Sequence, residues 1–507
     1  MCGIFASNDP MVPDSAGELL EKRLRFRGPD GSSGLVRRGG WSTYHSRLAI
    51  IDLAAGVNQP VNNPDGSRLI FNGEILNYKE LGKKYFDREY ISDVTLLNDL
   101  ILHRLLKAEE LDGFFAFIFI DSDGRLAYAC RDKFGVKPFF YYKTPGGHYT
   151  FSSEPSVLID LYSPRRNDQA IDEYRAFRYP LFSKSFYSGI SEVEPGTCLV
   201  NGRYFHLEDE LSQTSYTPAS QEELASALNN GVTSRCVSDA PIGLLMSRGI
   251  DSNLIRHAHK FQQYYTIGFP EDDDIRFLEE QSVENLKIIR TNPQAFAEAF
   301  AYLLELKGEP MSVPNEVLLY LVGKEAAADG VKVLLSGEGA DEFFAGYDRI
   351  FRWAADKREF DLGEFASHYC YTDLSNAPEI MAMLGDAFAG FETDSVFEKV
   401  RWFFIKYHMP VLFRRLDFSL MAAGIEGREP IANHHLFNIA KTLSAPDLMA
   451  GSLGKLPLRK LAEQYMGKEF AFAKKIGFPV DLTRIFANPH NLTSYELWFQ
   501  KNLEILG

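Results

Sequence analysis

The sequence predicts two domains: a mixed α+β domain rich in antiparallel strands, followed by an α/β domain built on a parallel sheet. The chain has 507 residues, more than a single hydrophobic core usually organises. Roughly the first 160 residues alternate short apolar runs with turn residues, whereas short strands separated by long helical stretches follow from about residue 221. We therefore expect domains at residues 1–206 and 221–507, joined by the polar, turn-rich stretch 207–221.

Turn residues and hydrophobic periodicity locate the elements of the first domain. The expected strands lie around a Gly-Gly turn in 35–53, in one run at 68–75, and in hairpins with Ser-Asp-Gly and Pro-Gly-Gly turns at 114–132 and 137–154. Apolar residues recur with helical spacing at 15–26 and 92–111. Hairpins interrupted by helices are typical of an α+β domain.

The second domain shows the alternation expected of parallel β-α units. A helical stretch at 222–237 precedes an apolar strand at 240–247, and further strands are expected at 263–269 and within 330–342. Long helical crossovers join parallel neighbours. Ligands of open parallel sheets bind at the carboxyl ends of the strands, so the loops that follow these strands are candidate binding sites.

Composition and charge restrict the partners of the chain. Hydrophobic residues make up 45% and charged residues 24%, as in ordinary soluble proteins. A formal net charge of −15, without a stripe of Lys and Arg, disfavours nucleic acids and anionic membranes. No apolar stretch approaches the about 18 to 20 residues that span a bilayer, and the first residues lack signal-peptide features. We therefore expect no nucleic-acid or membrane partner, and a cytoplasmic protein.

Five cysteines are scattered along the chain without a C-x-x-C pair: Cys2, Cys130, Cys198, Cys236 and Cys370. An odd, dispersed count predicts neither a disulfide framework nor a zinc site. Cys2 directly follows the initiator methionine. Removal of that methionine would leave a cysteine whose α-amine, with a pKa of about 7.7 to 8.0, can act as general base on its own thiol. A Met-Cys start by itself is more often incidental.

The segments after Cys2 favour a functional cysteine. Their sequences and their order along the chain resemble the class II glutamine amidotransferases, the N-terminal nucleophile domain of asparagine synthetases. The resemblance extends to about residue 196 and is carried by R-G-P-D-G at 27–31, H-S-R-L-A-I-I-D at 45–52, F-N-G-E-I-L-N at 71–77, S-D-V at 92–94, R-D-K-F-G-V-K-P-F-F-Y-Y at 131–142 and F-S-S-E at 151–154. It implies an αββα N-terminal nucleophile fold and an enzyme that releases ammonia from glutamine.

The resemblance also implies roles for single residues. Thiolate attack on a carboxamide builds a tetrahedral oxyanion, for which the Asn72 side chain and the Gly73 backbone N–H are the implied donors. The implied glutamine-binding residues are Arg47 for the α-carboxylate, Asp93 and Glu74 for the amino and amide ends, and Ile50 and Ile51 through their backbone. Taken singly, charged residues of this kind are more often surface ion-pair residues, whereas the ordered set favours a glutaminase.

The apolar strand of the second domain ends in S-R-G-I-D-S at 247–252, which resembles the pyrophosphate loop of the ATP pyrophosphatase family, whose members include asparagine synthetases and β-lactam synthetases. Backbone N–H groups at a helix N-terminus form an anion nest for phosphates. The implied ATP-binding residues are Leu245, Ser247, Arg248, Gly249, Asp251, Ser252, Ile267, Ser336 and Gly337. Asp251 is also the implied first Mg²⁺ ligand.

A second loop, S-G-E-G-A-D at 336–341, closely resembles the matching loop of asparagine synthetases. The resemblance implies Asp341 as the second Mg²⁺ ligand and Glu338 as an acid/base or substrate-orienting group. Lys455 aligns with the lysine that faces the acyl-adenylate, where its cation offsets developing negative charge. Segments 414–430 and 474–480 also resemble the family. The alternative for both loops is a capped helix with solvated acids.

Several positions depart from the family pattern. Arg248 replaces a glycine, and a side chain there would cost about 1 to 2 kcal/mol if the position requires a positive φ; alternatively its guanidinium contacts a phosphate. Asn253 replaces a usual serine, the stretch Pro430 to Asn433 departs from an apolar-apolar-Asp ending, and the usual histidine after Phe269 is missing. These changes put the acceptor in question more than the fold.

The motifs together predict a glutamine-dependent, ATP-dependent amidotransferase, an AMP-forming carbon–nitrogen ligase of the asparagine synthase type. ATP and Mg²⁺ are the expected cofactors, glutamine and a carboxylic acid are the expected substrates, and aspartate is the default acceptor. The alternatives are amidation of a different acid, such as a sugar acid or a biosynthetic intermediate, and a glutaminase whose synthetase domain binds nucleotide without catalysis. β-Lactam ring closure is less favoured because it needs no ammonia. The resemblance is compatible with a homodimer.

Overall fold

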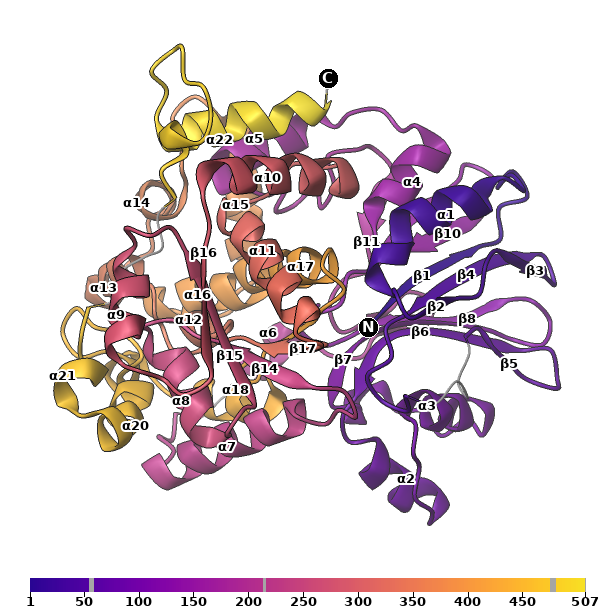
Figure 1. Ribbon diagram of the computed structural model, residues 1–507, viewed down its shortest axis with the longest axis horizontal. Coiled ribbons are helices and arrows are strands. Elements are labelled where there is room, and N and C mark those ends of the chain that lie inside the picture. Colours follow the sequence, from indigo (N-terminus) through magenta and orange to yellow (C-terminus); the bar gives the residue numbers. More distant parts are fainter. Residues whose placement is uncertain (54–58, 213–215, 475–479, 507) are drawn as a thin grey trace.

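The computed structural model describes residues 1–53, 59–212, 216–474 and 480–506. In Figure 1 the N-terminal part, in indigo to purple, forms stacked sheets on the right, while the C-terminal part, from magenta to yellow, surrounds a separate sheet on the left. The last long helix, α22 (Ser494–Leu503), lies beside α5 (Asp168–Phe177) of the N-terminal part, with the rings of Tyr174 and Phe499 5.1 Å apart. The end of the chain therefore packs on the first domain.

The strands of the N-terminal part form two antiparallel sheets. One has the order β11-β9-β10-β1-β4-β2, with β3 paired to β4, and the other has the order β13-β12-β8-β7-β6-β5. The bounds are β1 (Cys2–Ser7), β2 (Gly31–Ser32), β3 (Val36–Arg38), β4 (Trp41–Arg47), β5 (Val61–Asn62), β6 (Arg68–Ile75), β7 (Gly113–Ile120), β8 (Leu126–Arg131), β9 (Phe140–Lys143), β10 (Tyr149–Ser152), β11 (Ile190–Glu192), β12 (Thr197–Cys198) and β13 (Gly202–Arg203).

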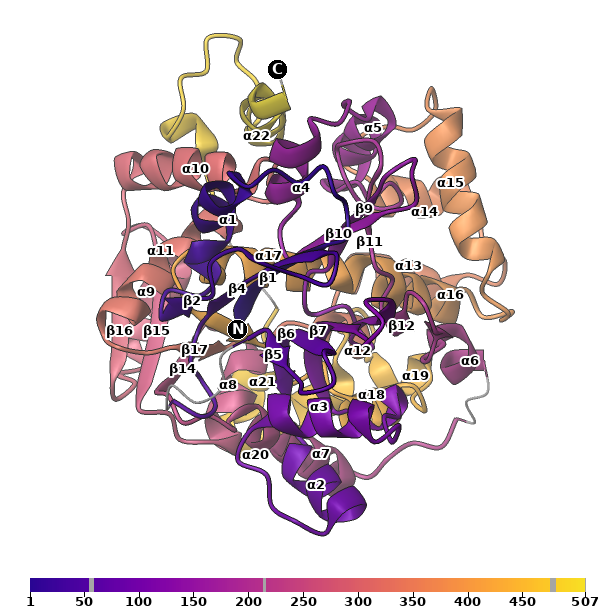
Figure 2. The same ribbon diagram turned by 90° about the vertical axis from the view of Figure 1, so that its right-hand side faces the viewer.

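Apolar side chains between the two sheets form the core of this part, among them Ile4, Ile70, Ala116 and Phe151. Helices cover the outer faces, as Figure 2 shows: α1 (Ala16–Leu24) and α4 (Pro155–Tyr162) lie on the first sheet, and α3 (Asp93–Leu102) lies on the second, with α2 (Tyr78–Phe86) packed against α3. The helix–sheet–sheet–helix layering confirms the predicted αββα fold.

The predicted hairpins are confirmed, and one predicted helix is shorter than expected. The Gly-Gly turn between β3 and β4 has φ angles of 54° and 76° at Gly39 and Gly40, which residues with a Cβ adopt only at a cost. The helical pattern 92–111 ends at Leu102, because Arg104 turns the chain with a φ of 58°. The apolar residues beyond it continue the periodicity of the sequence but not the helix.

The C-terminal part contains a parallel sheet of order β16-β15-β14-β17-β18, which confirms the predicted α/β fold. Its strands are β14 (Ile242–Leu245), β15 (Gln263–Gly268), β16 (Leu286–Arg290), β17 (Val333–Leu335) and β18 (Glu426–Arg428). The chain runs from β14 outward to β16 and then returns to place β17 on the other side of β14. The loops after β14 and β17 therefore flank the position where the strand order reverses, which is the usual ligand site of open parallel sheets.

Helices surround this sheet and form most of the C-terminal part (Figure 1). The longer ones are α7 (Gln221–Arg235), α8 (Ile250–Ala258), α9 (Asp273–Glu280), α10 (Pro293–Lys307), α11 (Asn315–Ala328), α13 (Asp348–Asp356), α14 (Leu362–Tyr369), α15 (Pro378–Ala389), α16 (Val396–Phe403), α17 (Met409–Met421), α18 (His434–Ala440) and α20 (Leu456–Met466). Short helices are α6 (Leu207–Ser212), α12 (Ala340–Phe343), α19 (Ala445–Leu448) and α21 (Lys468–Ala471). Helix α6 occupies the first half of the predicted linker. None of the described helices is long and apolar enough to cross a bilayer.

Five charged side chains are buried together where the two parts meet: Arg27, Lys137, Glu154, Arg414 and Asp417. Arg27 Nη1 donates to Glu154 Oε1 at 2.5 Å and to Asp417 Oδ2 at 2.8 Å. Arg414 Nη2 donates to Glu154 Oε2 at 2.6 Å, and Lys137 Nζ donates to Asp417 Oδ1 at 3.5 Å. Because Arg414 and Asp417 belong to α17, this interface cluster joins the two parts through hydrogen-bonded ion pairs.

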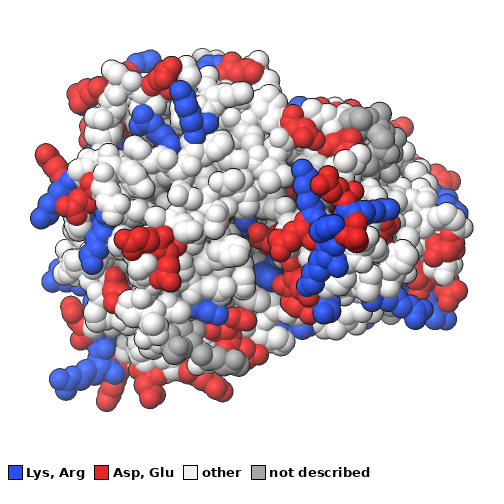
Figure 3. All heavy atoms as spheres, turned by 90° about the horizontal axis from the view of Figure 1, so that it is seen from below, with Lys and Arg blue, Asp and Glu red and all other residues white. Residues whose placement is uncertain are grey.

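The exposed charges are arranged differently from this buried cluster. On the face seen from below in Figure 3, Lys and Arg side chains lie beside Asp and Glu side chains. Exposed pairs of this kind include Lys83 of α2 with Asp87 directly after the helix, whose side chains are 70% and 84% exposed. Such pairs contribute about 0–1 kcal/mol each to stability, because water screens them.

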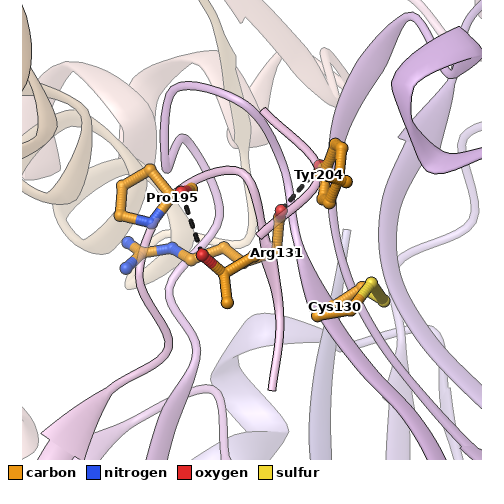
Figure 4. The surroundings of a disulfide bond; sticks show 6 residues. Cys130, Arg131, Pro195 and Tyr204 are labelled. Atoms are coloured by element: carbon orange, nitrogen blue, oxygen red, sulfur yellow. Dashed lines mark hydrogen bonds between the residues drawn. A yellow bond between two sulfur atoms is a disulfide. The ribbon is translucent and has the colours of Figure 1, made fainter. Parts of the chain in front are cut away.

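One disulfide corrects the prediction from the cysteine count. Cys130 of β8 and Cys198 of β12 are bonded, although the sequence predicted no disulfide framework. The two residues are 68 positions apart in the chain, and only the pairing of β8 with β12 places them opposite each other. In Figure 4 the bond lies next to Tyr204, whose hydroxyl donates to the Arg131 carbonyl at 2.7 Å. The sequence spacing carried no signal of this pairing.

Candidate active sites

The first candidate site surrounds Cys2 at the start of β1. Cys2 lies opposite Arg47 in the β1–β4 register, and its N–H donates to Asn72 Oδ1 at 2.9 Å. A small pocket with a cavity volume of about 40 Å³ opens there. Its wall includes Cys2, Arg47, Ile50, Ile51, Gly73, Glu74 and Asp93. The fold thus brings together every residue that the sequence predicted for glutamine hydrolysis, with Asn72 in contact with Cys2.

Asn72 presents an unpaired hydrogen-bond donor beside Cys2. The residue is fully buried, and although Oδ1 accepts the Cys2 N–H, Nδ2 has no hydrogen-bond partner in the described part of the chain. Leaving a buried donor unpaired costs on the order of 1–3 kcal/mol. The next residue, Gly73, has a φ of 136°, and a Cβ there would overlap the β7 backbone. The Nδ2 group is therefore positioned to donate to an oxyanion.

The thiol of Cys2 is not activated while Met1 is attached. Burial raises the pKa of Cys2 above its ordinary value, so the thiol is protonated at neutral pH, whereas the thiolate is the nucleophile. The Met1 α-amine is also occupied, because it lies 3.2 Å from Glu426 Oε2 and donates to the Leu48 carbonyl at 3.4 Å. Removal of Met1 would transfer the α-amine to Cys2 itself.

Asp93 and Glu74 are buried carboxyl groups in the wall of the same pocket. Asp93 opens α3 and accepts two backbone N–H bonds, at 3.0 and 2.9 Å. Burial raises the pKa of Asp93 to about 6. Burial also raises the pKa of Glu74, as do the charges of Asp93 and Glu426, while Arg428 opposes the increase. The pocket therefore contains a carboxyl group that titrates just below neutral pH.

We expect the Michaelis constant for glutamine to rise at acidic pH because of Asp93. Its carboxylate would pair with the α-ammonium of glutamine, and this charge is lost as the pH falls through about 6. Between pH 6 and pH 5 the ionised fraction falls from about one half to about one tenth, so KM should rise by about fivefold over that interval. Steady-state glutaminase assays from pH 5 to 8 measure this. In Asp93→Asn, KM should be high and nearly constant; a profile identical to that of the unmodified enzyme would contradict the assignment.

The loop that follows β4 carries Ile50 and Ile51 and is held by both parts of the chain. Arg47 Nη2 donates to the carbonyl oxygen of Asp52 in this loop. Asp239, from the C-terminal part, donates its N–H to the Ile50 carbonyl at 2.9 Å and accepts the Asp52 N–H at 2.8 Å. The backbone of Ile50 is therefore already engaged by the neighbouring domain.

Strand β18 supplies polar residues to this region that sequence reasoning missed. Arg428 Nε donates to Glu426 at 2.5 Å, and Arg428 Nη2 lies 3.9 Å from Glu74 Oε1. The next residue, Glu429, is 3% exposed, and burial raises its pKa to about 8. Because β18 pairs with β17, these residues connect the pocket at Cys2 to the loop after β17. Their signal in the sequence was the charged run E-G-R-E in a segment otherwise apolar.

The second candidate site lies where the loops after β14 and β17 meet. Leu245 is the last residue of β14, Ile267 lies near the end of the adjacent β15, and Ser336 follows β17. A Cβ added to Gly337 would lie 2.8 Å from the Asp251 Cβ, so the two loops are in contact and only a small residue fits. The structure thus brings together the two loops that resembled a nucleotide site.

Side chains within the first loop fix its shape. The Ser247 N–H donates to Ser252 Oγ at 3.1 Å, and the Gly249 N–H donates to Ser247 Oγ at 3.2 Å. Asn253 Nδ2 donates to the Ser247 carbonyl at 3.1 Å and to the Gly249 carbonyl at 2.9 Å. A serine hydroxyl has one hydrogen to donate, so Asn253 binds two carbonyls that a single serine would not bind together.

Arg248 does not strain this loop. Its φ is negative, so the cost that a positive φ would impose on a side chain does not arise. The guanidinium Nε lies 3.7 Å from Asp274 Oδ1 of α9, and the guanidinium carbon lies 5.4 Å from the centre of the Phe277 ring. Arg248 therefore contacts a neighbouring helix, and its side chain does not strain the backbone of the loop after β14.

Lys455 joins the two loops through their aspartates. Its ammonium lies 2.7 Å from Asp251 Oδ2 and 2.8 Å from Asp341 Oδ1, and the residue is 3% exposed. Lys455 precedes α20 with a φ of 59°, and its N–H donates to the Phe344 carbonyl at 2.9 Å. The predicted lysine and both predicted metal ligands therefore form one cluster. Glu338, in the same loop as Asp341, lies in the wall of an adjoining cavity.

The departure at 430–433 has a local structural reason. Asn433 caps α18, because its Oδ1 accepts the Leu436 N–H at 3.0 Å. Its Nδ2 donates to the Pro430 carbonyl at 2.6 Å, a bond that the usual aspartate would lack. The segment 475–479, within the predicted family segment 474–480, lies outside the described residues.

The two domains and their sites define the class of the protein: a glutamine-dependent carbon–nitrogen ligase that uses ATP. Residues 1–216 match the glutamine amidotransferase domain family, and residues 223–505, more than half of the chain, match the asparagine synthase family. The chain belongs to the asparagine synthase family.

Curated relatives share this organisation along most of the chain. Asparagine synthetase (glutamine-hydrolyzing) 1 of Bacillus subtilis (strain 168) is 26% identical over 575 aligned residues, which cover 97% of this chain and 89% of the relative. The putative asparagine synthetase (glutamine-hydrolyzing) 1 of Methanocaldococcus jannaschii is 31% identical over an alignment that covers 64% of this chain and 61% of the relative. Asparagine synthetase (glutamine-hydrolyzing) 1 of Arabidopsis thaliana is 29% identical over an alignment that covers 71% of this chain and 62% of the relative.

Proposed function

We propose that this chain hydrolyses glutamine at Cys2 and transfers the ammonia to a carboxylic acid that its second domain has activated as an acyl-adenylate. Residues 1–206 would form the glutaminase and residues 221–507 the synthetase. The observation that carries the proposal is the position of Lys455 between Asp251 and Asp341, since this joins a lysine and two carboxylates at the edge of a parallel sheet. A nucleotide-binding module without catalysis has no need of such a lysine.

At the first site the Cys2 α-amine, once Met1 is removed, takes the thiol proton, and the thiolate attacks the glutamine carboxamide. Asn72 Nδ2 and the Gly73 N–H donate to the oxyanion as it forms. The carbon–nitrogen bond breaks, ammonia leaves with the proton from the α-amine, and a thioester remains on Cys2. Water then hydrolyses the thioester to glutamate and restores the thiol. Arg47 and Asp93 would hold the two charged ends of glutamine during these steps.

At the second site the acceptor carboxylate attacks the α-phosphate of ATP, which gives acyl-AMP and pyrophosphate. Asp251 and Asp341 are suited to hold Mg²⁺, because Asp251 Oδ1 is buried without a hydrogen-bond partner among the described residues and Mg²⁺ binds one or two carboxylates together with phosphates. The metal would neutralise phosphate charge. Lys455 would offset the charge on the departing group. Ammonia then displaces AMP and yields the amide, AMP and a proton.

The acceptor defines two versions of this function. The relatives named above are asparagine synthetases, which favours aspartate, with asparagine as product. The second version is amidation of another acid, and the cavity described below favours it. Mg²⁺ as the metal and a homodimer as the assembly belong to the proposal by family resemblance.

Pyrophosphate release tests the proposal. With ATP, Mg²⁺ and glutamine, a panel of acids that includes aspartate should contain at least one that releases pyrophosphate in proportion to amide and glutamate. Lys455→Met should lower this rate by about 10² to 10³-fold, because a preorganised cation at the reacting group is lost. Lys460→Met, which changes an exposed lysine of the same helix, should leave it unchanged. No release with any acid would favour the module that only binds nucleotide.

A further inference from the structure

A cavity of about 800 Å³ lies between the two parts of the chain, with Glu338 in its wall. The wall also contains Arg178, directly after α5 of the N-terminal part, together with Arg415 of α17 and Tyr495 of α22. Pockets of about 300–1,000 Å³ hold molecules of drug size. The cavity therefore exceeds what an amino acid of the size of aspartate requires, and it reaches the synthetase site through Glu338.

Arg178 is held in this cavity by two aromatic rings. The residue ends α5 in a left-handed conformation with a φ of 63°, and its N–H donates to the Tyr174 carbonyl at 2.7 Å. Its guanidinium carbon lies 3.4 Å from the centre of the Tyr371 ring and 3.8 Å from that of the Tyr495 ring. Stacking between two rings fixes the plane of the guanidinium without using its N–H groups.

Those N–H groups have no acceptor in the described structure. Arg178 is 7% exposed, and its buried Nε and Nη2 atoms have no hydrogen-bond partner among residues 1–53, 59–212, 216–474 and 480–506. Burial lowers the pKa of Arg178, and the charge of Arg415 lowers it further. A buried cation without a counter-ion is costly, so its retention here calls for an anionic partner from outside the chain.

Arg415 is a second cation in the same wall. No described residue forms a hydrogen bond or an ion pair with its side chain. The wall contains three acidic residues: Glu316 pairs with Lys307 at 3.0 Å, Asp481 pairs with Arg484 at 3.1 Å, and Glu338 belongs to the loop after β17. The cavity thus presents two guanidinium groups, and the carboxylates of Glu316 and Asp481 do not neutralise them.

We infer that this cavity is the acceptor site and that the acceptor is a dianionic acid longer than aspartate. Its reacting carboxylate would lie on the Glu338 side, near the loop after β17, and its second anionic group would bind Arg178 and Arg415. Carboxylate and phosphate groups both fit a planar guanidinium, so either can be the second anion. The inference rests on the proposed synthetase function and names the substrate class of that site. It also makes Arg178 of the N-terminal part a specificity residue for the reaction of the C-terminal part.

Calorimetric titration of the full-length enzyme tests the binding site directly. The probes are glutarate and adipate, which are dicarboxylates of increasing length, 3-phosphoglycerate, which carries a phosphate, and the monoacid valerate. Dianions should bind about 10 to 100-fold more tightly than valerate, which is the contribution expected of charge-assisted hydrogen bonds to a buried arginine. The ranking of adipate, glutarate and 3-phosphoglycerate identifies the second anion and the spacing between the two groups.

Matched variants assign this selectivity to the two arginines. Arg178→Gln and Arg415→Gln should each weaken dianion binding by about 10-fold or more and leave valerate binding unchanged. Arg178→Lys should recover part of the loss, because it restores the charge without the planar donors. The control is Arg175→Gln, which changes an exposed arginine of α5 that pairs with Asp172 at 3.1 Å. Thermal melting verifies that each variant is folded.

Activity assays separate this inference from the proposed function. Arg178→Gln should raise the KM of a dianionic acceptor in pyrophosphate release and leave the KM values of glutamine and ATP within about twofold. Equal binding of valerate and the dianions, or equal behaviour of Arg178→Gln and Arg175→Gln, would overturn the inference. Aspartate turnover with a KM that Arg178→Gln does not alter would also overturn it while the synthetase activity stands. Arg178-dependent dianion binding with no pyrophosphate release from any acid would refute the proposed function and leave the binding site.

Discussion

Replacing Cys2 by alanine should lower glutamine hydrolysis by about 10⁴-fold or more and leave ammonia-dependent amide formation within about twofold of the unmodified enzyme. The loss is large because no other group can form the thioester, and removal of a covalent nucleophile costs about 10⁴ to 10⁶-fold in comparable enzymes. The second reaction is spared because Asp251, Asp341 and Lys455 belong to a different site. Glutamate release from glutamine, and amide formation from ammonium chloride, measure the two activities.

The control for this variant is Cys236→Ala, which removes a partly exposed free cysteine outside the pocket and should retain both activities. Mass spectrometry of the mature enzyme should find Cys2 as the first residue, since the Met1 amine otherwise occupies Glu426 and the Cys2 thiol stays protonated. An active glutaminase that retains Met1, or one that retains activity in Cys2→Ala, would contradict the mechanism proposed for the first site.

The second large effect concerns stability. Asp417→Ala should lower the free energy of unfolding by about 3–5 kcal/mol, because it leaves Arg27 and Lys137 in the interior without the carboxylate that they share. Chemical denaturation followed by far-UV circular dichroism measures the change. The matched control is Lys83→Ala, which breaks the exposed Lys83–Asp87 pair and should cost no more than about 1 kcal/mol. Equal losses in the two variants would contradict a stabilising role for the interface cluster.

The same carboxylate gives stability a pH dependence with a defined sign. Burial alone would raise the pKa of Asp417, but Arg27 and Lys137 lower it below the ordinary value. A group with a lowered folded-state pKa stabilises the protein above the unfolded-state pKa of about 3.9, and this contribution is lost as the pH falls through the folded-state pKa. The stability difference between the unmodified protein and Asp417→Ala should therefore be largest near neutral pH and shrink in acid.

Much of the fold could be predicted because local rules were sufficient. Hairpins such as β7–β8 carry strong turn residues between apolar runs, and the parallel strands β14 and β17 end in small-residue loops. The strands β16 and β18 were missed. Strand β16 contains charged residues at both ends of a short apolar run, and β18 reads E-G-R, which has no β-propensity. Both are strands because neighbouring strands offer them hydrogen bonds.

Some residues of the candidate sites and of the interface could be predicted from the sequence, and others could not. Cys2, Asn72 and Asp251 stand in ordered motifs, so the sequence pointed to them directly. Arg178 and Asp417 stand in no motif, and their importance follows from burial and from what surrounds them. The disulfide between Cys130 and Cys198 is a similar case, since strand pairing alone makes the two residues neighbours.

The sequence by itself determined the two domain types and pointed to the candidate nucleophile and to the two loops that resemble a phosphate site, because short-range chemistry at fixed spacing specifies each of them. The tertiary structure decided how the domains share charges: which cations are neutralised at the interface, which carboxylates Lys455 joins, and where Arg178 is buried without a hydrogen-bond partner for Nε and Nη2 in the described part of the chain. The physical reason is that the energy of a charge in a protein depends on its burial and on neighbours hundreds of residues away. A local sequence pattern does not specify these distant neighbours, and only the folded chain brings them together.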